Sequence, residues 1–310
     1  MIEISIVIPV YNSAENLEEL CYQINDALKD IAYELILVND RSPDNSWAVI
    51  EQLSDKYAQV LGLNLRKNCG QDNALLAGLN YAKGKYAVIM DDDLQHSPYD
   101  IIKLYEACKN SNSDVCYGNF EKREQALWKN LGSWFNGKIS EWMMNKPKNI
   151  YLSPYKLFTK DIVDEIIKYE GPYPYIDGLI LWVTDNVFQI DIEHHKRYKG
   201  SSNFNLSRSI SVFLKNITTF SVVPLRLASL IGLICSLAGF GLILYYLVDY
   251  YINGNVVEGW TTLAVVQLFL GGLMLLFLGL TGEYLGRTYM NVNKKPQFTI
   301  KEITSGQAKE

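Results

Sequence analysis

The chain is poor in the residues that build zinc sites and disulfide frameworks. Its 310 residues include only three histidines and five cysteines, and no two cysteines form a Cys-x-x-Cys pair. An odd number of such isolated cysteines favours a reducing compartment over a disulfide-stapled secreted fold. The histidines, at positions 96, 194 and 195, lack the spacing of zinc ligands. We therefore expect no zinc.

An excess of positive charge is also missing. The 29 lysines and arginines are outnumbered by 34 acids, for a formal net charge of −5. This balance argues against a protein that wraps nucleic acid. The N-terminus has no basic segment or cleavage site of a secretory signal, so we expect the part of the chain before the C-terminal apolar stretches to stay in the cytoplasm. The length suits one sizeable α/β domain and something smaller.

Two stretches near the C-terminus contain no charged residue at all. They run from Leu227 to Val248 and from Thr261 to Gly282, and each has 22 residues. At a rise of about 1.5 Å per residue, a helix of this length spans about 33 Å and can cross the hydrocarbon core of a bilayer. Helices buried in a soluble domain are the alternative. We predict a hairpin of two transmembrane helices over residues 224–288.

The charges that flank these stretches predict an orientation. The flanking basic residues are Arg197, Lys199, Arg208, Lys215 and Arg226 before the first stretch, and Arg287, Lys294 and Lys295 after the second. The connection from Asp249 to Trp260 has no lysine or arginine. By the positive-inside rule, the domain before the first stretch and both termini are expected in the cytoplasm, with the two stretches in the inner membrane of a multi-pass protein.

The first 120 residues alternate between apolar runs and amphipathic segments. The predicted strands are Ile4–Val10, Glu34–Val38, Val60–Leu65, Tyr86–Met90 and Val115–Tyr117. The predicted helices are one capped by Ser13, then Ser46–Tyr57, Asn73–Ala82 and Ile101–Lys109. Such alternation predicts a mostly parallel sheet with right-handed crossovers. Two further amphipathic helices are expected, over Leu127–Met144 and, next to the membrane, over Asn205–Phe220.

Polar residues follow four of the predicted strands. They are Tyr11, Asp40, Lys67 and Asp91. Ligands of parallel sheets bind outside the carboxyl ends of the strands, so these residues indicate a site. The last of them opens Asp91-Asp92-Asp93-Leu94-Gln95, whose three acids repel one another. Oxygen ligands suit Mg²⁺ or Mn²⁺, and such a cation could hold a nucleotide diphosphate. An acidic helix N-terminus is the alternative.

Five motifs and the C-terminal half resemble a known family. The motifs are Ser5-Ile6-Val7-Ile8-Pro9-Val10-Tyr11-Asn12, Val38-Asn39-Asp40-Arg41-Ser42, Asn68-Cys69-Gly70, Gly84-Lys85-Tyr86 and Asp91-Asp92-Asp93-Leu94-Gln95. Together they resemble glycosyltransferase family 2, in particular its polyprenyl-phosphate branch, which includes dolichol-phosphate mannose synthase. Pro224-Leu225-Arg226-Leu227 and Gly282-Glu283-Tyr284-Leu285-Gly286-Arg287 are similar to the bacterial undecaprenyl-phosphate glycosyltransferases. The resemblance covers about residues 2–290.

The resemblance implies a GT-A fold and the transfer of one sugar from a UDP-linked donor to polyprenyl phosphate. It also implies that the protein is a tetramer. The residues implied around the nucleotide are Pro9, Tyr11, Asn12, Glu15 and Asp40, with Lys67, Asn68 and Asp92 at the same rim. Asp91, Asp93 and Gln95 would hold the metal and diphosphate. The residues implied at the sugar, the acceptor phosphate or the closing segment are Arg123, Lys129, Ser133, Arg197 and Ser202. The implied division is a catalytic domain over 1–204, a juxtamembrane helix over 205–223, the hairpin and a tail over 289–310.

The chain departs from the family pattern at three places. Pro154 stands where the family often has an aspartate proposed as acid or base, Phe120 replaces a common arginine, and Asn203-Phe204 replaces a Lys-Tyr pair. Asp177 is the nearest surviving carboxylate; it contacts the sugar or caps a helix. The plainer interpretations are a helix cap for Asp40 and a solvated helix face for Arg123 and Lys129.

Other functions are weighed against this one. A processive polysaccharide synthase would carry a Gln-x-x-Arg-Trp motif, and a nucleotidyltransferase would carry a glycine-rich N-terminal loop; the sequence has neither. A membrane-anchored scaffold or binding protein with a degenerate site is the alternative from a different class. Pro154 favours that alternative, and the intact acidic motif argues against it.

Overall fold

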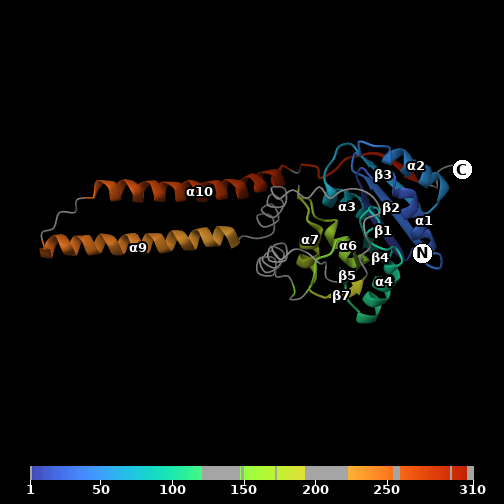
Figure 1. Cartoon of the computed structure of the whole chain (residues 1–310), viewed down its shortest axis with the longest axis horizontal. Helices are drawn as coiled ribbons and strands as arrows, with labels where there is room; N and C mark the ends of the chain where they lie inside the picture. Colours follow the sequence, from blue (N-terminus) through green and yellow to red (C-terminus); the bar gives the residue numbers. More distant parts are fainter. Residues whose placement is uncertain are drawn as a thin grey trace. The chain divides into compact units, whose positions relative to one another are not determined.

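A computed structural model of the chain describes residues 2–120, 147, 150–171, 173–192, 223–253, 259–293 and 295–305 (Figure 1). The chain divides into two units. The first comprises Met1–Phe204 together with Lys294–Glu310, and the second comprises Asn205–Asn293. The predicted helices over 127–144 and 205–220 lie outside the described residues.

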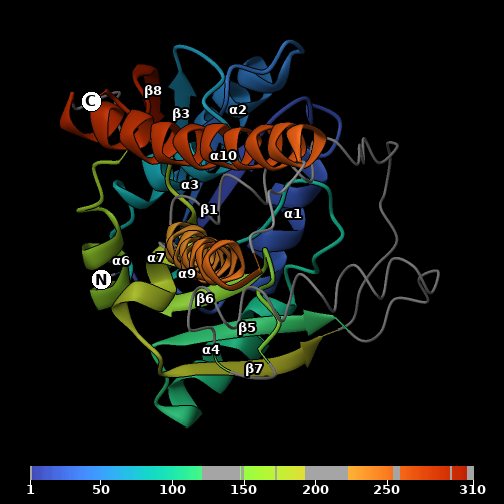
Figure 2. The same cartoon turned by 90° about the vertical axis from the view of Figure 1, so that its left-hand side faces the viewer.

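The first unit is built on one eight-stranded sheet with the order β7-β5-β6-β4-β1-β2-β3-β8. Its strands are β1 (Ile4–Val10), β2 (Tyr33–Asn39), β3 (Val60–Leu65), β4 (Tyr86–Ile89), β5 (Val115–Phe120), β6 (Lys156–Thr159), β7 (Val187–Ile192) and β8 (Ile300–Ser305). The centre, from β3 through β2 and β1 to β4, is parallel. β6 runs antiparallel between β4 and β5, and β7 lies parallel to β5 (Figure 2).

The helices of this unit connect the strands as crossovers or follow them. They are α1 (Leu17–Ala27), α2 (Ser46–Lys56), α3 (Gln71–Leu79), α4 (Asp100–Ser111), α6 (Lys160–Ile166) and α7 (Ile176–Val183). The predicted strands Ile4–Val10 and Val60–Leu65 are confirmed to the residue, and the other predicted strands and helices differ by a few residues at their ends. One local prediction is wrong. Ser13 does not cap α1, because Asn16 holds the cap position and the Ser13 hydroxyl donates to the Tyr11 carbonyl at 3.3 Å.

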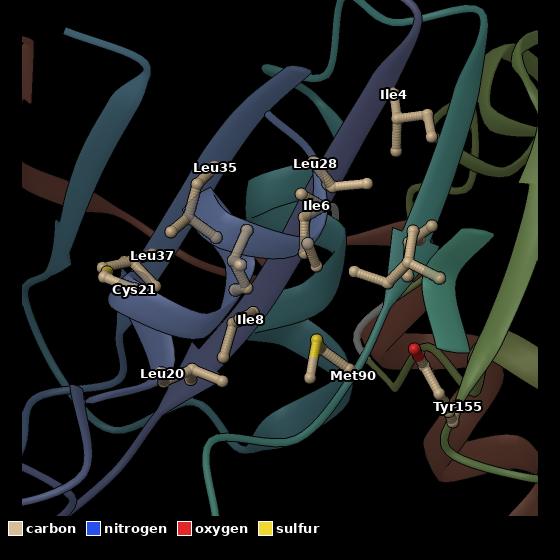
Figure 3. Packing of buried hydrophobic residues seen from close by; sticks show 14 of the residues in the cluster. Ile4, Ile6, Ile8, Leu20, Cys21, Leu28, Leu35, Leu37, Met90 and Tyr155 are labelled. Carbon is tan, nitrogen blue, oxygen red and sulfur yellow. The ribbon is translucent and has the colours of Figure 1, made fainter. Parts of the chain in front are cut away.

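The main core cluster lies between the central strands and helices α1, α2 and α4. Ile4, Ile6 and Ile8 alternate along one face of β1 and are fully buried. Figure 3 shows them beside Leu20, on α1, and Leu28, just after it. Both faces of β1 are covered, which is why its sequence is a continuous apolar run rather than an alternating one. This apolar packing fixes the positions at which the strands end.

The second unit contains two long helices, α9 (Val223–Asn253) and α10 (Trp260–Val292). Each contains a segment long and apolar enough to cross a membrane, Leu225–Leu242 and Val266–Val292, with mean hydropathies of 1.9 and 1.7. Their apolar side chains are exposed, as at Leu268, which is 77% exposed. Exposed apolar surface on this scale marks a site of contact with lipid or protein. Arg287 pairs with Glu283 one turn away at 2.7 Å.

Candidate active site

The loops that follow β1, β2 and β4 meet at one edge of the sheet. Val10 is in register with Asn39, and Val7 with Ile89, so the three strands end side by side. Each following loop contains a non-glycine residue in the left-handed region: Asn12 (φ 59°), Arg41 (φ 56°) and Leu94 (φ 58°). Such conformations cost of order 1–3 kcal/mol each and cluster at functional sites. The edge is therefore shaped at the expense of backbone strain.

The acidic motif lies in the loop after β4. The amide of Gln71 donates to Asp91 at 2.8 Å, and the backbone N–H of Gln95 donates to Asp93 at 3.1 Å. Asp92 accepts the backbone N–H of Tyr11 at 3.2 Å and so joins this loop to the loop after β1. The three acids are half-buried, whereas Leu94 is buried and anchors the loop.

Two carboxyl groups of this loop have raised pKa values. Burial, followed by the charges of Asp93 and Asp92, raises the pKa of Asp91 to about 7. Burial also raises the pKa of Asp92 to about 6, although the hydrogen bonds from Ser13 and Tyr11 oppose the shift. A cation near these groups would favour their ionised forms. The acids thus remain costly to ionise until a positive charge arrives.

The residues present fit a hard divalent cation. Asp91, Asp93 and Gln95 offer only oxygen ligands, the type that Mg²⁺ and Mn²⁺ prefer. In the described part of the chain, no three His, Cys, Asp or Glu side chains form a metal-binding group. Two carboxylates are nevertheless enough for Mg²⁺ when substrate phosphates complete its shell. The donor set therefore suits a metal that binds together with a diphosphate.

Asp40 organises the neighbouring turn. It is 3% exposed, and its carboxylate accepts the backbone N–H groups of Cys69 at 2.6 Å and Gly70 at 2.8 Å. Asn68 donates to the Asp40 carbonyl at 3.2 Å. Burial raises the pKa of Asp40, and the two N–H bonds work against that shift. Gly70 has φ 89° and is the N-cap of α3, so Asp40, directly after β2, fixes the turn between β3 and α3. The role of Asp40 at the nucleoside stays a prediction.

A buried ion pair that sequence reasoning missed lies beside the acidic loop. Lys156 of β6 pairs with Asp177 in the first turn of α7, and their side chains are only 4% and 13% exposed. The Tyr117 hydroxyl donates to the same Asp177 oxygen at 2.9 Å. Lys156 is in register with Ile89, the last residue of β4. Its position between Tyr155 and Leu157 in a strand was the available signal. Asp177 is not the helix cap, since Tyr175 holds that position.

Asp72 adds to the charge around this pair. The backbone N–H of Ile176 donates to its carboxylate at 3.3 Å. Burial and the charge of Asp177 raise the pKa of Asp72 to about 6, and the charge of Lys156 opposes this. Lys156 also lowers the pKa of Asp91 relative to what burial alone would give. One buried cation thus acts on three carboxylates at this edge.

His96 holds the start of the acidic loop in place. It is buried, and its Nδ1 accepts the backbone N–H of Asp91 at 3.3 Å. Its ring stacks on Tyr155 with centroids 5.1 Å apart, and the Tyr155 hydroxyl donates to the Ser97 carbonyl at 2.9 Å. These contacts account for His96 as a loop anchor.

The structure brings together many of the residues that the sequence singles out. Tyr11 is 54% exposed at the edge, and Asn12, Glu15, Lys67 and Asn68 are exposed, while Pro9 lies half-buried within β1. The candidates that lie outside the described residues are Arg123, Lys129, Ser133, Arg197 and Ser202.

The sheet and the acidic loop together match a known group of enzymes. The model of the family described as glycosyl transferase family 2 matches residues 5–166. The chain belongs to glycosyl transferase family 2. The family resemblance expected from the sequence motifs is thereby confirmed.

Curated relatives extend the likeness over nearly the whole chain, including the apolar helices. An uncharacterized glycosyltransferase of Synechocystis sp. (strain ATCC 27184 / PCC 6803 / Kazusa) is 31% identical over 97% of this chain and 96% of its own length. A prophage bactoprenol glucosyl transferase homolog of Escherichia coli K12 is 29% identical over 97% of this chain and 99% of its own length. An undecaprenyl-phosphate 4-deoxy-4-formamido-L-arabinose transferase of Proteus mirabilis is 29% identical over 97% and 94%.

Solved structures confirm the fold. Glucosyl-3-phosphoglycerate synthase from Mycobacterium tuberculosis, in complex with Mn²⁺, UDP and glucosyl-3-phosphoglycerate, matches with a TM-score of 0.53 at 16% identity. The match covers 70% of this chain and 78% of the synthase. The family 2 domain therefore has the GT-A fold, with the predicted mostly parallel sheet.

Proposed function

We propose that this glycosyltransferase moves a single sugar from a UDP-linked donor to undecaprenyl phosphate, with inversion at the anomeric carbon. The product would be a lipid-phosphate-sugar for modification of cell-envelope glycans. One observation carries the proposal: acids with raised pKa values gather at the ligand-binding edge of a GT-A sheet, in a chain that also has two exposed apolar helices. The relatives named for bactoprenol and undecaprenyl phosphate each align with 97% of this chain, an alignment long enough to include both parts.

The donor would bind at the edge formed by the loops after β1, β2 and β4. Tyr11, Asn12 and Asp40 would contact the nucleoside, supported by Pro9, Glu15, Lys67, Asn68 and Asp92. Asp91, Asp93 and Gln95 would hold Mg²⁺ or Mn²⁺. The metal, when bound, offsets charge on the leaving diphosphate. Lys156 and Asp177 lie beside this loop, where Lys156 tempers the negative charge.

The acceptor explains why the chain can do without the aspartate that Pro154 replaces. A phosphate monoester has a second pKa of about 6 and is largely dianionic at neutral pH. It needs little deprotonation, so a general base adds little, in contrast to a sugar hydroxyl acceptor. Direct attack by one phosphate oxygen inverts the anomeric centre. Arg123 and Lys129 would orient the attacking anion, with Ser133, Arg197 and Ser202 around it.

Strand β8 supports the proposed membrane topology. β8 follows α10 in the chain, yet it pairs with β3 in the same sheet that is formed by residues preceding α9. This pairing favours an arrangement in which both ends of the hairpin lie on the same side of the membrane that α9 and α10 would cross. Two crossings satisfy this condition. Together with the basic flanks, this favours a cytoplasmic catalytic domain with both termini on the same side. A tetramer is proposed from the family resemblance alone.

A donor panel tests the proposal. The full-length protein in membranes receives labelled UDP-sugars, Mn²⁺ and undecaprenyl phosphate, and label extractable into organic solvent is measured. We expect label from one donor only when the lipid phosphate is present. Asp93→Asn is the matched control. Its turnover should fall by about 10²-fold or more, while its Tm should stay that of the wild type. No lipid label from any donor would favour the scaffold alternative.

A further inference from the structure

The segment that follows the second apolar helix reaches back to the donor edge. Residues 295–305 include β8, which pairs antiparallel with β3 at the end of the sheet (Figure 2). Glu302 lies directly across from Asn64, and a register shift between Asn64 and Leu65 lets the pairing continue. The last bond between the two segments is donated by the backbone N–H of Arg66 to the Thr299 carbonyl at 2.8 Å. The tail thus borders the turn that Asp40 organises.

A chain of hydrogen bonds runs from this tail into the loops of the site. The amide of Asn64 donates to Glu302 Oε2 at 2.9 Å, and its oxygen accepts from the amide of Asn39 at 2.9 Å. The Asn39 oxygen then accepts the backbone N–H of Ser42 at 3.2 Å. The Ser42 hydroxyl in turn accepts the backbone N–H of Asn12 at 3.2 Å. The chain of bonds ends at two of the three strained loops, those with Asn12 and Arg41, both of which have positive φ.

The polarity of this chain gives Glu302 a directing role. A carboxylate can only accept, so it sets the Asn64 amide with its nitrogen toward β8 and its oxygen toward Asn39. That orientation obliges Asn39 to donate to Asn64 and to accept from Ser42. Asn39 and Asn64 are 2% and 5% exposed, so water cannot readily replace these partners. Glu302 itself is 43% exposed, and its other oxygen pairs with Lys301 at 2.8 Å.

The tail is tied to the domain independently of Glu302. Gln297 donates to the carbonyls of Tyr169 and Gly171, each at 2.7 Å. On the other side, a Cβ added at Gly62 would lie 2.4 Å from the Thr304 hydroxyl, which shows how closely β3 and β8 approach. Loss of one side-chain bond at Glu302 should therefore leave the strand in place and act on the loops.

We propose that the C-terminal tail is part of the donor site's support, with Glu302 as a positioning residue for the loops that contain Asn12 and Asp40–Ser42. The residue lies 238 positions from its partner Asn64 in the chain, beyond both apolar helices. Only the expected effect of Glu302 on nucleotide binding rests on the proposed function. The loop geometry is a property of the protein without any ligand.

Hydrogen exchange on the full-length protein in detergent tests the proposal without a ligand. In Glu302→Ala, amides in residues 10–13 and 39–43 should exchange about threefold faster, the size expected for one net hydrogen bond. Glu302→Gln keeps an acceptor oxygen and should behave like the wild type. Lys301→Ala, the matched control, removes the exposed ion pair and keeps the Asn64 bond, so both loops should be unchanged. Should Glu302→Ala fail to fold, Glu302→Thr, which suits a strand better, is measured in its place.

The second readout is UDP binding, measured by calorimetry with Mn²⁺. The affinity for UDP should weaken about threefold in Glu302→Ala and stay unchanged in Glu302→Gln and Lys301→Ala. Unchanged exchange in both loops overturns the proposal, as does an equal effect of Lys301→Ala. Wild-type protein that binds no UDP would count against the proposed function and leave the exchange result to decide the role of Glu302.

Discussion

The two ends of the same strands differ in how their polar groups are satisfied. At the amino end, the Ser5 hydroxyl and the backbone N–H of Lys83 both donate to Glu34 at 2.6 Å, and Gly84 N–H donates to Ser5 at 2.8 Å. At the carboxyl end, Asp91 and Asp92 carry raised pKa values. At the amino end, protein groups donate to the buried carboxylate, whereas at the carboxyl end the acids are costly to ionise. We expect the first edge to serve stability, and we propose that the second serves binding.

Removing the buried cation beside the acidic loop should have the largest effect on the fold. Lys156→Met would leave Asp177 and Asp72 in a buried site without their positive partner. We expect a loss of about 3 kcal/mol, or a fall in Tm of about 8 °C, in thermal unfolding of the full chain. Lys168→Met is the control, because its pair with Glu165 is exposed and should be worth less than about 0.5 kcal/mol. Equal shifts for the two variants would contradict this prediction.

Breaking the amino edge should cost stability and spare chemistry. Glu34→Ala removes the acceptor of Ser5 and of the Lys83 N–H, both of which lie in a buried or part-buried position. We expect a loss of about 2 kcal/mol, seen as a fall in Tm of about 5 °C, with turnover per folded molecule unchanged. Glu51→Ala, an exposed position on α2, should leave Tm as it is. A loss of turnover at full stability would remove the distinction between the two edges.

The smallest expected effect is a pH dependence of the metal-free protein. The pKa values of Asp91, about 7, and of Asp72 and Asp92, about 6, lie above the usual value of about 3.9. The native state then binds more protons than the unfolded state, so stability is greatest below this range and falls as pH rises through it. Between pH 6 and pH 8, Asp91 alone should account for about 1 kcal/mol, or about 3 °C in Tm.

A substitution isolates that contribution. Asp91→Asn should flatten the Tm profile between these pH values, whereas Asp55→Asn, on the exposed face of α2, should keep it. Added Mn²⁺ should stabilise the wild type more at the higher pH, because the acids must be ionised to bind it. If the Tm of the metal-free wild type does not change between pH 6 and pH 8, the raised pKa values assigned to the acids of the carboxyl edge are wrong.

The parts of the fold that could be predicted are those that local sequence determines. β1, β2 and β4 are buried, mostly apolar runs, and their ends put Tyr11, Asp40 and Asp91 at one edge. β6, β7 and β8 were not predicted. β8 in particular has exposed residues and obtains its conformation from pairing with β3, which lies far away in the chain. A strand that depends on a distant partner has little signal of its own.

The candidate site shows the same limit. The acidic motif could be predicted because consecutive acids after a buried strand have few structural uses. Lys156 could not, since a lone lysine is normally exposed and its burial depends on Asp177, 21 residues further on. The role of Glu302 is hidden for the same reason. Contacts between side chains that are distant in sequence determine which charges a site retains.

Binding of UDP with and without a divalent cation tests the central claim most directly. Calorimetry on the full-length protein at pH 7.5 compares UDP alone, UDP with Mn²⁺, and both conditions in Asp93→Asn. We expect Mn²⁺ to tighten UDP binding about tenfold or more in the wild type and to have little effect in the variant. An equal affinity for UDP with and without Mn²⁺ in the wild type, or an equal gain in Asp93→Asn, would contradict the claim that these acids hold a metal and diphosphate.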